Sequence, residues 1–233
     1  MPTILVVDDD RSLIDVYASA LEDRFDIVPV GSGAVALQHI RSDPPDMVLL
    51  DLVLPDGDGS LLVPKIRALS SVPIIVLSGR QSQADRVLSL KMGADDFISK
   101  PFDLDDLDAR IEAVLRRCAA QLPAPSSPGP NTVCGTLQLT RSHLAHINGR
   151  PFHVTPTEFH LLTALVAASP ETVEHEALGL VVWPRDDPSF SHLVHVHIGR
   201  LRKRLASVAG APTIHTAYDG CSRRTPRGYS IHP

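Results

Sequence analysis

The sequence predicts two domains of different fold class. The first is an α/β domain with a doubly wound, five-stranded parallel sheet, and the second is an α+β domain of short strands, three helices and a terminal β-hairpin. The chain has 233 residues, more than most single domains use. Apolar runs alternate with amphipathic stretches in the first half only. Between the halves, residues 122–130 contain four prolines and no charged residue, which is typical of a linker.

In the first half, five apolar runs rich in β-branched residues each precede an amphipathic stretch. Continuous apolar strands are buried on both faces, and a helix between successive strands is the connection that a parallel sheet requires. The strands are predicted at residues 4–7, 27–30, 47–50, 74–77 and 97–98, and the helices at residues 13–21, 34–40, 61–69, 84–90 and 104–115.

The second half begins with short β segments and continues with helical stretches. The strands are predicted at residues 136–139, 145–147 and 152–154, the helices at residues 157–168, 174–182 and 189–206, and the hairpin at residues 213–217 and 229–231. This order predicts a winged-helix arrangement, in which the third helix can enter the major groove of DNA.

The third predicted helix of the second half is amphipathic. Its apolar side chains repeat at spacings of four and three, which places on one stripe Val194, Ile198, Leu201, Leu205 and Val208. The opposite side carries His192, His195, Gly199, Arg202 and Lys203, flanked by Arg200. A solvated basic face is the common interpretation of such a pattern, and a DNA-binding face is the alternative.

Charge is unevenly divided between the halves. The net charge of −5 combines 12 Lys and Arg against 20 Asp and Glu in residues 1–120 with 10 against 7 in residues 121–233, and ten of the eleven histidines lie in the second half. Only the second half therefore has the positive charge that suits binding to nucleic acid. The predicted domains are residues 1–119 and 132–233, joined by a linker at residues 120–131.

Several classes of protein are disfavoured by the sequence. No apolar run reaches the roughly 18 residues of a membrane span, and acid follows the first apolar run directly, so we expect a cytoplasmic protein without a signal peptide. Cys118, Cys134 and Cys221 lack paired spacing, which predicts reduced thiols. A histidine metal sensor is disfavoured because His143 and His146 would point to opposite faces of a strand.

Polar residues follow four of the five predicted strands of the first half. Asp8, Asp9 and Asp10 follow the first strand, Asp51 the third, Ser78 the fourth, and Lys100 with Pro101 the fifth. Ligands bind at the carboxyl ends of such strands, and clustered carboxylates there favour a hard divalent cation such as Mg²⁺. The alternative for any one of these acids is a helix cap or a solvated turn.

With these motifs, residues 1–118 resemble the receiver domain of two-component response regulators, which has a flavodoxin-like fold. The segment from Leu49 to Gly59, with Pro55 downstream of Asp51, matches the family's phospho-acceptor loop. The resemblance implies that a histidine kinase phosphorylates Asp51. It implies that Mg²⁺ is bound by Asp8, Asp9, Asp51 and the backbone carbonyl of Val53, and that Ser78 and Lys100 contact the phosphoryl oxygens.

The same resemblance implies a conformational switch and a dimer. The switch residues are Ser78, Phe97 and Pro101, the last matching a cis-proline of the family. The homodimer that forms on phosphorylation would pair, across subunits, Arg86 with Asp106, Asp96 with Arg110, and Lys91 with Glu112. Solvated charges are the alternative for these six residues.

The second half resembles the output domain of OmpR/PhoB-type transcription factors, through the motif at residues 154–162, Trp183, the motif at residues 197–205 and Arg227-Gly228-Tyr229. The resemblance implies a base contact for Arg200, phosphate contacts for Arg202 and Lys203, and wing contacts for Arg223, Arg224 and Arg227. His192 and His195 share the exposed side of the helix. His195 replaces an aspartate common in the family, and Gly199 replaces a frequent basic residue.

The combined resemblance implies a transcription regulator that is not an enzyme beyond its own phosphoryl transfer and dephosphorylation. Its implied partners are a histidine kinase, tandem half-sites of double-stranded DNA, RNA polymerase and a second copy of the chain. Two alternatives stay open at this point. One is a magnesium-dependent phosphohydrolase with Asp51 as nucleophile, and the other is a regulator that acts through protein contacts with weakened DNA specificity.

Overall fold

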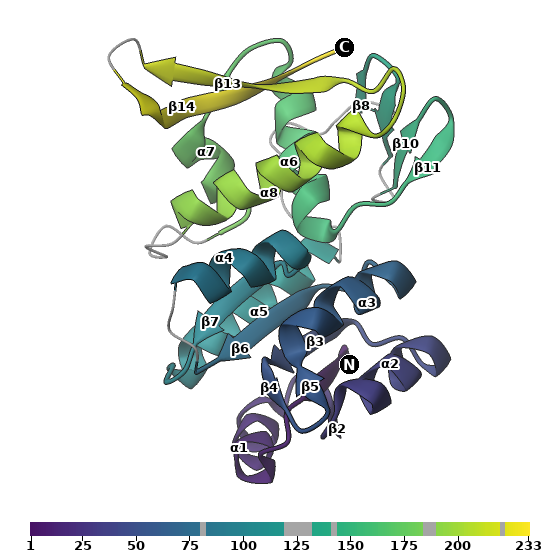
Figure 1. The fold of residues 1–233 in the computed structure, drawn as a ribbon, viewed down its shortest axis with the longest axis vertical. Helices are drawn as coiled ribbons and strands as arrows, with labels where there is room; N and C mark the ends of the chain where they lie inside the picture. Colours follow the sequence, from purple (N-terminus) through teal and green to yellow (C-terminus); the bar gives the residue numbers. More distant parts are fainter. Residues whose placement is uncertain (80–82, 119–131, 141–143, 184–189, 220–221) are drawn as a thin grey trace. The chain divides into compact units, whose positions relative to one another are not determined.

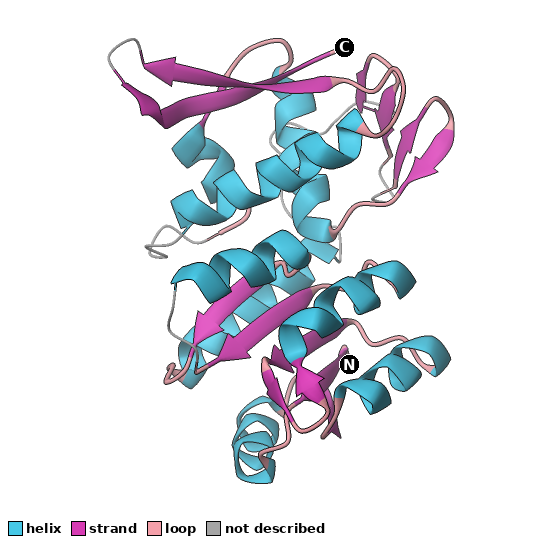
Figure 2. Cartoon of the chain, in the orientation of Figure 1, coloured by secondary structure: helices cyan, strands magenta, loops and turns pink. Residues whose placement is uncertain are grey.

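The computed structural model describes residues 1–79, 83–118, 132–140, 144–183, 190–219 and 222–233, and it divides into two compact units (Figure 1). The first unit is Met1–Leu115 and the second is Arg116–Pro233. Strands and helices alternate through the first unit, whereas strands flank three helices in the second (Figure 2). The predicted linker at residues 120–131 lies outside the described residues.

The first unit is the predicted doubly wound domain. Its five parallel strands have the spatial order β2-β1-β3-β6-β7. The strands are β1 (Thr3–Val7), β2 (Asp26–Val30), β3 (Met47–Asp51), β6 (Ile74–Ser78) and β7 (Asp96–Ser99). The helices are α1 (Arg11–Leu21), α2 (Gly33–Ser42), α3 (Leu62–Leu69), α4 (Gln83–Met92) and α5 (Leu104–Cys118). All ten elements match the predicted order and type, with ends that shift by a few residues.

Helices cover both faces of this sheet, which explains why its central strands β3 and β6 are apolar up to their last residues, Asp51 and Ser78. Every residue of β3 and β6 is buried. On one face, α1 and α5 pack against the sheet through Ile14, Leu21, Leu107 and Ile111. The helices α2, α3 and α4 contact one another in series and cover the other face (Figure 1).

Two short features of the first unit were not predicted. The chain after β3 forms a small hairpin of β4 (Val53–Leu54) and β5 (Gly57–Asp58), followed by a 3₁₀ turn at Gly59–Leu61. A two-residue strand carries too little periodic signal to be recognised from sequence. The hairpin also holds Asp56, whose carboxylate accepts hydrogen bonds from the amides of Gly33 and Ala34 at the start of α2.

The second unit is of the predicted winged-helix type. An antiparallel sheet of order β11-β10-β9-β8 comes first and three helices follow. A second sheet, of order β12-β14-β13, joins a short strand between the first two of these helices to the terminal hairpin. The strands are β8 (Thr132–Cys134), β9 (Leu137–Leu139), β10 (Ala145–Ile147), β11 (Arg150–Phe152), β12 (Val173–Glu174), β13 (Thr213–Asp219) and β14 (Ser222–His232). The helices are α6 (Pro156–Ala168), α7 (His175–Leu180) and α8 (Phe190–Ala206).

The helices of the second unit begin and pack as the sequence pattern indicates. Thr155 caps α6 in a capping box with Glu158, and Pro156 occupies the first turn. The apolar stripe of α8 is buried at Val194, Ile198, Leu201 and Leu205. This stripe fixes which side of α8 faces solvent.

The terminal hairpin differs from the prediction in length. β13 continues to Asp219 and β14 begins at Ser222, so both strands extend beyond the predicted residues 213–217 and 229–231. The register shifts near Tyr218, which pairs with Pro226. Proline has no amide hydrogen to donate, so a regular ladder cannot continue there. Within the described ranges, no helix is long and apolar enough to cross a membrane.

Candidate functional site

Four neighbouring strands of the first unit carry the predicted polar residues at their carboxyl ends. Asp8 follows β1, Asp51 ends β3, Ser78 ends β6 and Lys100 follows β7, and these strands are adjacent in the order β1-β3-β6-β7. Asp8 and Asp51 are buried, with exposed fractions of 3% and 7%, and Ser78 is fully buried. The sheet topology therefore brings together residues that lie up to 92 positions apart.

Lys100 joins the two buried carboxylates. Its ammonium donates to Asp8 Oδ2 at 2.9 Å and to Asp51 Oδ2. The remaining oxygens accept backbone amides, since Asp10 N donates to Asp8 Oδ1 at 2.9 Å and Val53 N donates to Asp51 Oδ1 at 2.7 Å. Each carboxylate is thus fixed by its own loop with one oxygen turned toward the ammonium.

The pKa of Lys100 reflects this arrangement. Burial acts to lower the pKa, but hydrogen bonds from the ammonium to Asp51 and Asp8 outweigh burial and raise the pKa above its usual value. Lys100 therefore stays charged at neutral pH, as a cation within contact of both carboxylates. The Lys100–Pro101 peptide bond is cis, in agreement with the resemblance.

The three aspartates that follow β1 have different environments. Asp8 is buried in the site, and Asp9 is exposed. Asp10 is the N-cap of α1, where its carboxylate accepts from the amides of Ser12 and Leu13. The capping alternative is therefore correct for Asp10.

Asp8 and Asp51 fit a hard divalent cation. Both are buried, both supply carboxylate oxygens at one point of the sheet edge, and such oxygens are the ligands that Mg²⁺ prefers. Among the described residues, no three Asp, Glu, His or Cys side chains are gathered as a ready metal cluster. Asp9 and the Val53 carbonyl stay predicted ligands.

The packing around Asp51 requires glycine at position 59 but leaves open space at Gly79. A side chain at Gly59 would put its Cβ 2.3 Å from the Asp51 carbonyl oxygen, so only glycine allows the 3₁₀ turn to approach β3 this closely. At Gly79, beside Ser78, a Cβ would have no atom within 4 Å. The site is thus tightly packed behind Asp51 and open beside Ser78.

The predicted switch residues Ser78 and Phe97 lie on the adjacent strands β6 and β7, and β6 is the neighbour of the strand that ends at Asp51. Phe97 on β7 is 3% exposed, so its ring is turned inward. The amide of Lys100 donates to the Ser78 carbonyl at 2.8 Å, which ties the end of β6 to the loop after β7.

Sequence reasoning missed Tyr17 as a site residue. Tyr17 lies on α1 with 2% of its surface exposed, close enough to Lys100, Asp8 and Asp51 for their charges to act on its hydroxyl. Burial raises the pKa of Tyr17, and the nearby Lys100 charge only partly offsets this. In the sequence, Tyr17 occupies an apolar position of an amphipathic helix, so the pattern predicts a core residue and gives no signal of this proximity.

The predicted dimer residues form contacts within one protomer. Arg110 contacts Asp96 at 3.1 Å and Asp106 at 3.0 Å. Glu112 pairs with Arg24, which precedes β2. Arg86 is half-buried and Lys91 is exposed. The cross-subunit pairs stay predictions, and those of Asp96, Arg110 and Glu112 would have to replace or share these internal contacts.

Some of the predicted DNA-binding residues of α8 are exposed, and others contact residues of the same unit. His195 and Lys203 are exposed. The Arg202 guanidinium donates to the Ile214 carbonyl at 2.8 Å and lies 5.6 Å from the centre of the Tyr229 ring. Arg200 is 12% exposed and contacts the buried Glu158. The side chains of His192, Arg223 and Arg224 lie outside the described part of the structure.

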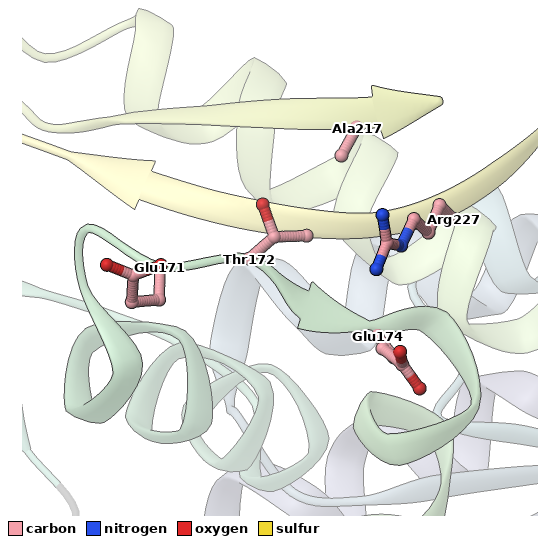
Figure 3. A pocket seen from close by; sticks show the side chains of 5 residues that line it. All are labelled: Glu171, Thr172, Glu174, Ala217 and Arg227. Atoms are coloured by element: carbon pink, nitrogen blue, oxygen red, sulfur yellow. The ribbon is translucent and has the colours of Figure 1, made fainter. Parts of the chain in front are cut away.

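Arg227 lies in an acidic environment on the terminal hairpin. It lines a shallow pocket with Glu171, Thr172, Glu174 and Ala217 (Figure 3). Glu174 of β12 is paired with Gly228, the residue after Arg227. Arg227 is exposed, and the same pocket includes two carboxylates that would repel phosphate.

Comparisons with known proteins agree with this geometry. Residues 4–112 match the response regulator receiver domain, and residues 149–220 match the transcriptional regulatory protein C-terminal family. The chain is 37% identical over 213 residues to the DNA-binding response regulator MtrA of Mycobacterium tuberculosis, covering 91% of each chain. It is 35% identical over 206 residues to the sensory transduction protein RegX3 of Mycolicibacterium smegmatis, covering 88% of this chain and 90% of RegX3.

Two further comparisons extend the same relationship. The chain is 31% identical over 214 residues to the KDP operon transcriptional regulatory protein KdpE of Escherichia coli, covering 91% of this chain and 93% of KdpE. A solved RitR variant has the same fold, with a TM-score of 0.75 at 22% identity over 100% of this chain and 99% of that chain. The chain therefore belongs to the OmpR/PhoB family of two-component response regulators, with a receiver domain and a DNA-binding effector domain.

Proposed function

We propose that a histidine kinase phosphorylates Asp51 and that this phosphorylation controls DNA binding by the second unit. The observation that carries the proposal is the convergence of Asp8, Asp51 and Lys100 at one edge of the sheet. A phosphorylated receiver would form a homodimer, which places two winged helices on tandem DNA half-sites. Joining two binding modules raises occupancy through effective concentration.

The chemistry follows from the groups at this edge. An Asp51 carboxylate oxygen attacks the phosphorus atom, the bond from phosphorus to the donor breaks, and the donor leaves with the electron pair. The product is an aspartyl phosphate. Lys100 balances the negative charge of the phosphoryl oxygens, and the Ser78 hydroxyl donates to one of them.

We propose that Mg²⁺ is held by Asp8 and Asp51, with Asp9 and the Val53 carbonyl as further ligands. When bound, the ion supplies positive charge that neutralises the transferring phosphoryl group. The burial of Asp8 and Asp51 supports this proposal, because two close carboxylates repel each other unless cations balance them.

The direct test is labelling with a small-molecule phosphodonor in the presence of Mg²⁺. The wild-type chain should acquire one phosphoryl group, and Asp51→Asn should acquire none. The exposed Asp15→Asn on α1 is a matched control that should label as the wild type does. Full labelling of Asp51→Asn would contradict the site assignment.

DNA binding by this chain is proposed from its own residues and from relatives such as MtrA, which is named a DNA-binding response regulator. Lys203 and His195 face solvent on α8, where phosphate and base edges could be reached. RNA polymerase is a further proposed partner. Genomic footprinting with and without phosphodonor tests whether phosphorylation controls DNA binding. Footprints that are the same in both conditions would contradict control by Asp51.

A regulator that acts through protein contacts is the second candidate. The acidic surroundings of Arg227 and the internal contact of Arg200 favour it, because both reduce the positive charge offered to a duplex. Duplex binding that weakens steeply with salt supports the first candidate, and binding that does not change with salt supports the second.

A further inference from the structure

We propose that Asp56 is a positioning residue for phosphoryl transfer, which ties the loop after Asp51 to the start of α2. The proposal rests on the proposed function, since it concerns the orientation of Asp51. The Asp56 carboxylate accepts a hydrogen bond from the amide of Gly33 at 3.0 Å and another from the amide of Ala34 at 2.9 Å. Asp56 therefore joins two separate segments of the chain beside the phosphorylation site.

The two amides that Asp56 accepts belong to the first turn of α2, where a helix has no internal partner for its N–H groups. Ser32 is the N-cap residue, and its hydroxyl accepts from the amide of Val35 at 3.4 Å. Asp56 serves the two amides before Val35, so the cap of α2 is shared with the loop after β3. These bonds hold the pKa of Asp56 below its usual value, so the carboxylate is charged at neutral pH.

A short hairpin connects Asp56 to the loop of the proposed phospho-acceptor. Asp56 lies at the tip of the hairpin of β4 and β5, in which Val53 pairs with Asp58 (Figure 1). At the base of the hairpin, the Gly59 amide donates to the Leu52 carbonyl at 2.9 Å. The hairpin is therefore closed at its base by its own backbone and tied at its tip to α2.

The hairpin carries the amide that orients Asp51. Val53 N donates to Asp51 Oδ1 at 2.7 Å, which fixes the direction of the carboxylate. Leu52 and Leu54, on either side of Val53, are buried and hold the base of the hairpin. Asp56 holds the tip, so both ends of the segment that contains this amide are fixed. A nucleophile that is already oriented loses less freedom on the way to the transition state.

The test compares Asp56→Ala with a matched control at the opposite edge of the sheet. Asp46 is also an exposed aspartate that accepts a distant backbone amide, that of Thr3 at 2.7 Å, but it precedes β3 instead of following it. In Asp56→Ala, the amide proton of Val53 should shift upfield and exchange with solvent about fivefold faster than in wild type. Asp46→Ala removes the same charge and should leave the Val53 signal unchanged.

Magnesium affinity is a readout that a purely structural role would not change. Asp51 is a proposed ligand, so Asp56→Ala should bind Mg²⁺ about fivefold more weakly, the factor expected when a capping contact no longer holds the binding-competent loop. Linkage is reciprocal, so saturating Mg²⁺ should slow exchange of the Gly33 and Ala34 amides in wild type by the same factor. Loss of the Asp56 charge alone would weaken Mg²⁺ binding, but it gives no reason for this slower exchange.

NMR titration of the full chain with Mg²⁺ measures the affinity and both amide signals. A Val53 signal that is the same in Asp56→Ala and wild type would overturn the proposal. A wild-type Mg²⁺ affinity in Asp56→Ala, or equal weakening in Asp46→Ala, would also overturn it. If wild type binds no Mg²⁺ and is not labelled by acetyl phosphate, the proposed function fails, and the Val53 signal still decides whether Asp56 positions the Asp51 carboxylate.

Discussion

Glu158 Oε1 and Arg200 Nη2 lie 3.0 Å apart, and the Glu158 side chain is fully buried. The pair links α6 to α8, and Arg204 contacts the other oxygen of the same carboxylate. Arg200 is the residue to which the family resemblance gives a base contact. Base reading by Arg200 stays a prediction, and it would require the guanidinium to leave or share Glu158.

The Glu158–Arg200 contact predicts a stability effect. Arg200→Ala should lower the free energy of unfolding by about 2 kcal/mol, because the buried carboxylate loses one of the two charged partners that it has among the described residues. Urea unfolding measures this. The exposed Lys203→Ala, three residues further along α8, is the matched control and should change stability by less than about 0.5 kcal/mol. If Arg200→Ala and wild type have the same free energy of unfolding, the contact does not contribute to stability.

Lys203 should instead affect the salt dependence of DNA binding. Its exposed ammonium on α8 is suited to a phosphate contact. Lys203→Ala should reduce the slope of log affinity against log salt concentration by about 1, with affinity lost almost equally on all sequences. Fluorescence anisotropy at several salt concentrations measures the slope. An unchanged slope would remove Lys203 from the proposed interface.

The Asp96–Arg110 contact predicts how dimerisation responds to mutation. If Arg110 exchanges Asp96 of its own protomer for that of a second copy, Arg110→Ala should prevent the dimer that a phosphodonor induces in wild type. Sedimentation velocity at micromolar concentration measures this. Arg24→Ala is the comparison variant. It releases Glu112 from its internal pair and should therefore leave the dimer intact or strengthen it. Dimers of Arg110→Ala at wild-type strength would refute the exchange.

Tyr229 predicts a loss of stability in alkali. Burial raises the pKa of Tyr229 to about 12, against a smaller opposing effect of Arg202. The unfolded chain, with a tyrosine pKa near 10.0, therefore loses this proton first. The contribution of the neutral Tyr229 hydroxyl to the free energy of unfolding is complete below pH 10. It is lost between pH 10 and 12, by up to about 1.4 kcal/mol per pH unit.

Urea unfolding of wild type and Tyr229→Phe at several alkaline pH values isolates this contribution. The difference in unfolding free energy between the two proteins should shrink as pH rises from 10 to 12. The phenylalanine variant removes only the titrating hydroxyl, which contacts His195 Nδ1 at 3.3 Å. A difference that does not change with pH would contradict the buried, neutral hydroxyl.

Local sequence patterns predicted the order of the ten elements in the first unit and which side of α8 is buried. These features depend on local periodicity, which the burial of β3, β6 and the α8 stripe satisfies. Sequence position at strand ends also predicted that Asp8, Asp51, Ser78 and Lys100 share one edge, because parallel strands align their carboxyl ends.

Which groups each side chain contacts became known only from the folded chain. Tyr17 and Arg200 show this most clearly. An apolar position on α1 holds a tyrosine near the charge of Lys100. A basic position on α8 holds Arg200, which pairs with Glu158 on α6. Such contacts join segments that are distant in the chain, so no local pattern encodes them. They exist because a buried charge or hydroxyl must find a partner once folding has removed water.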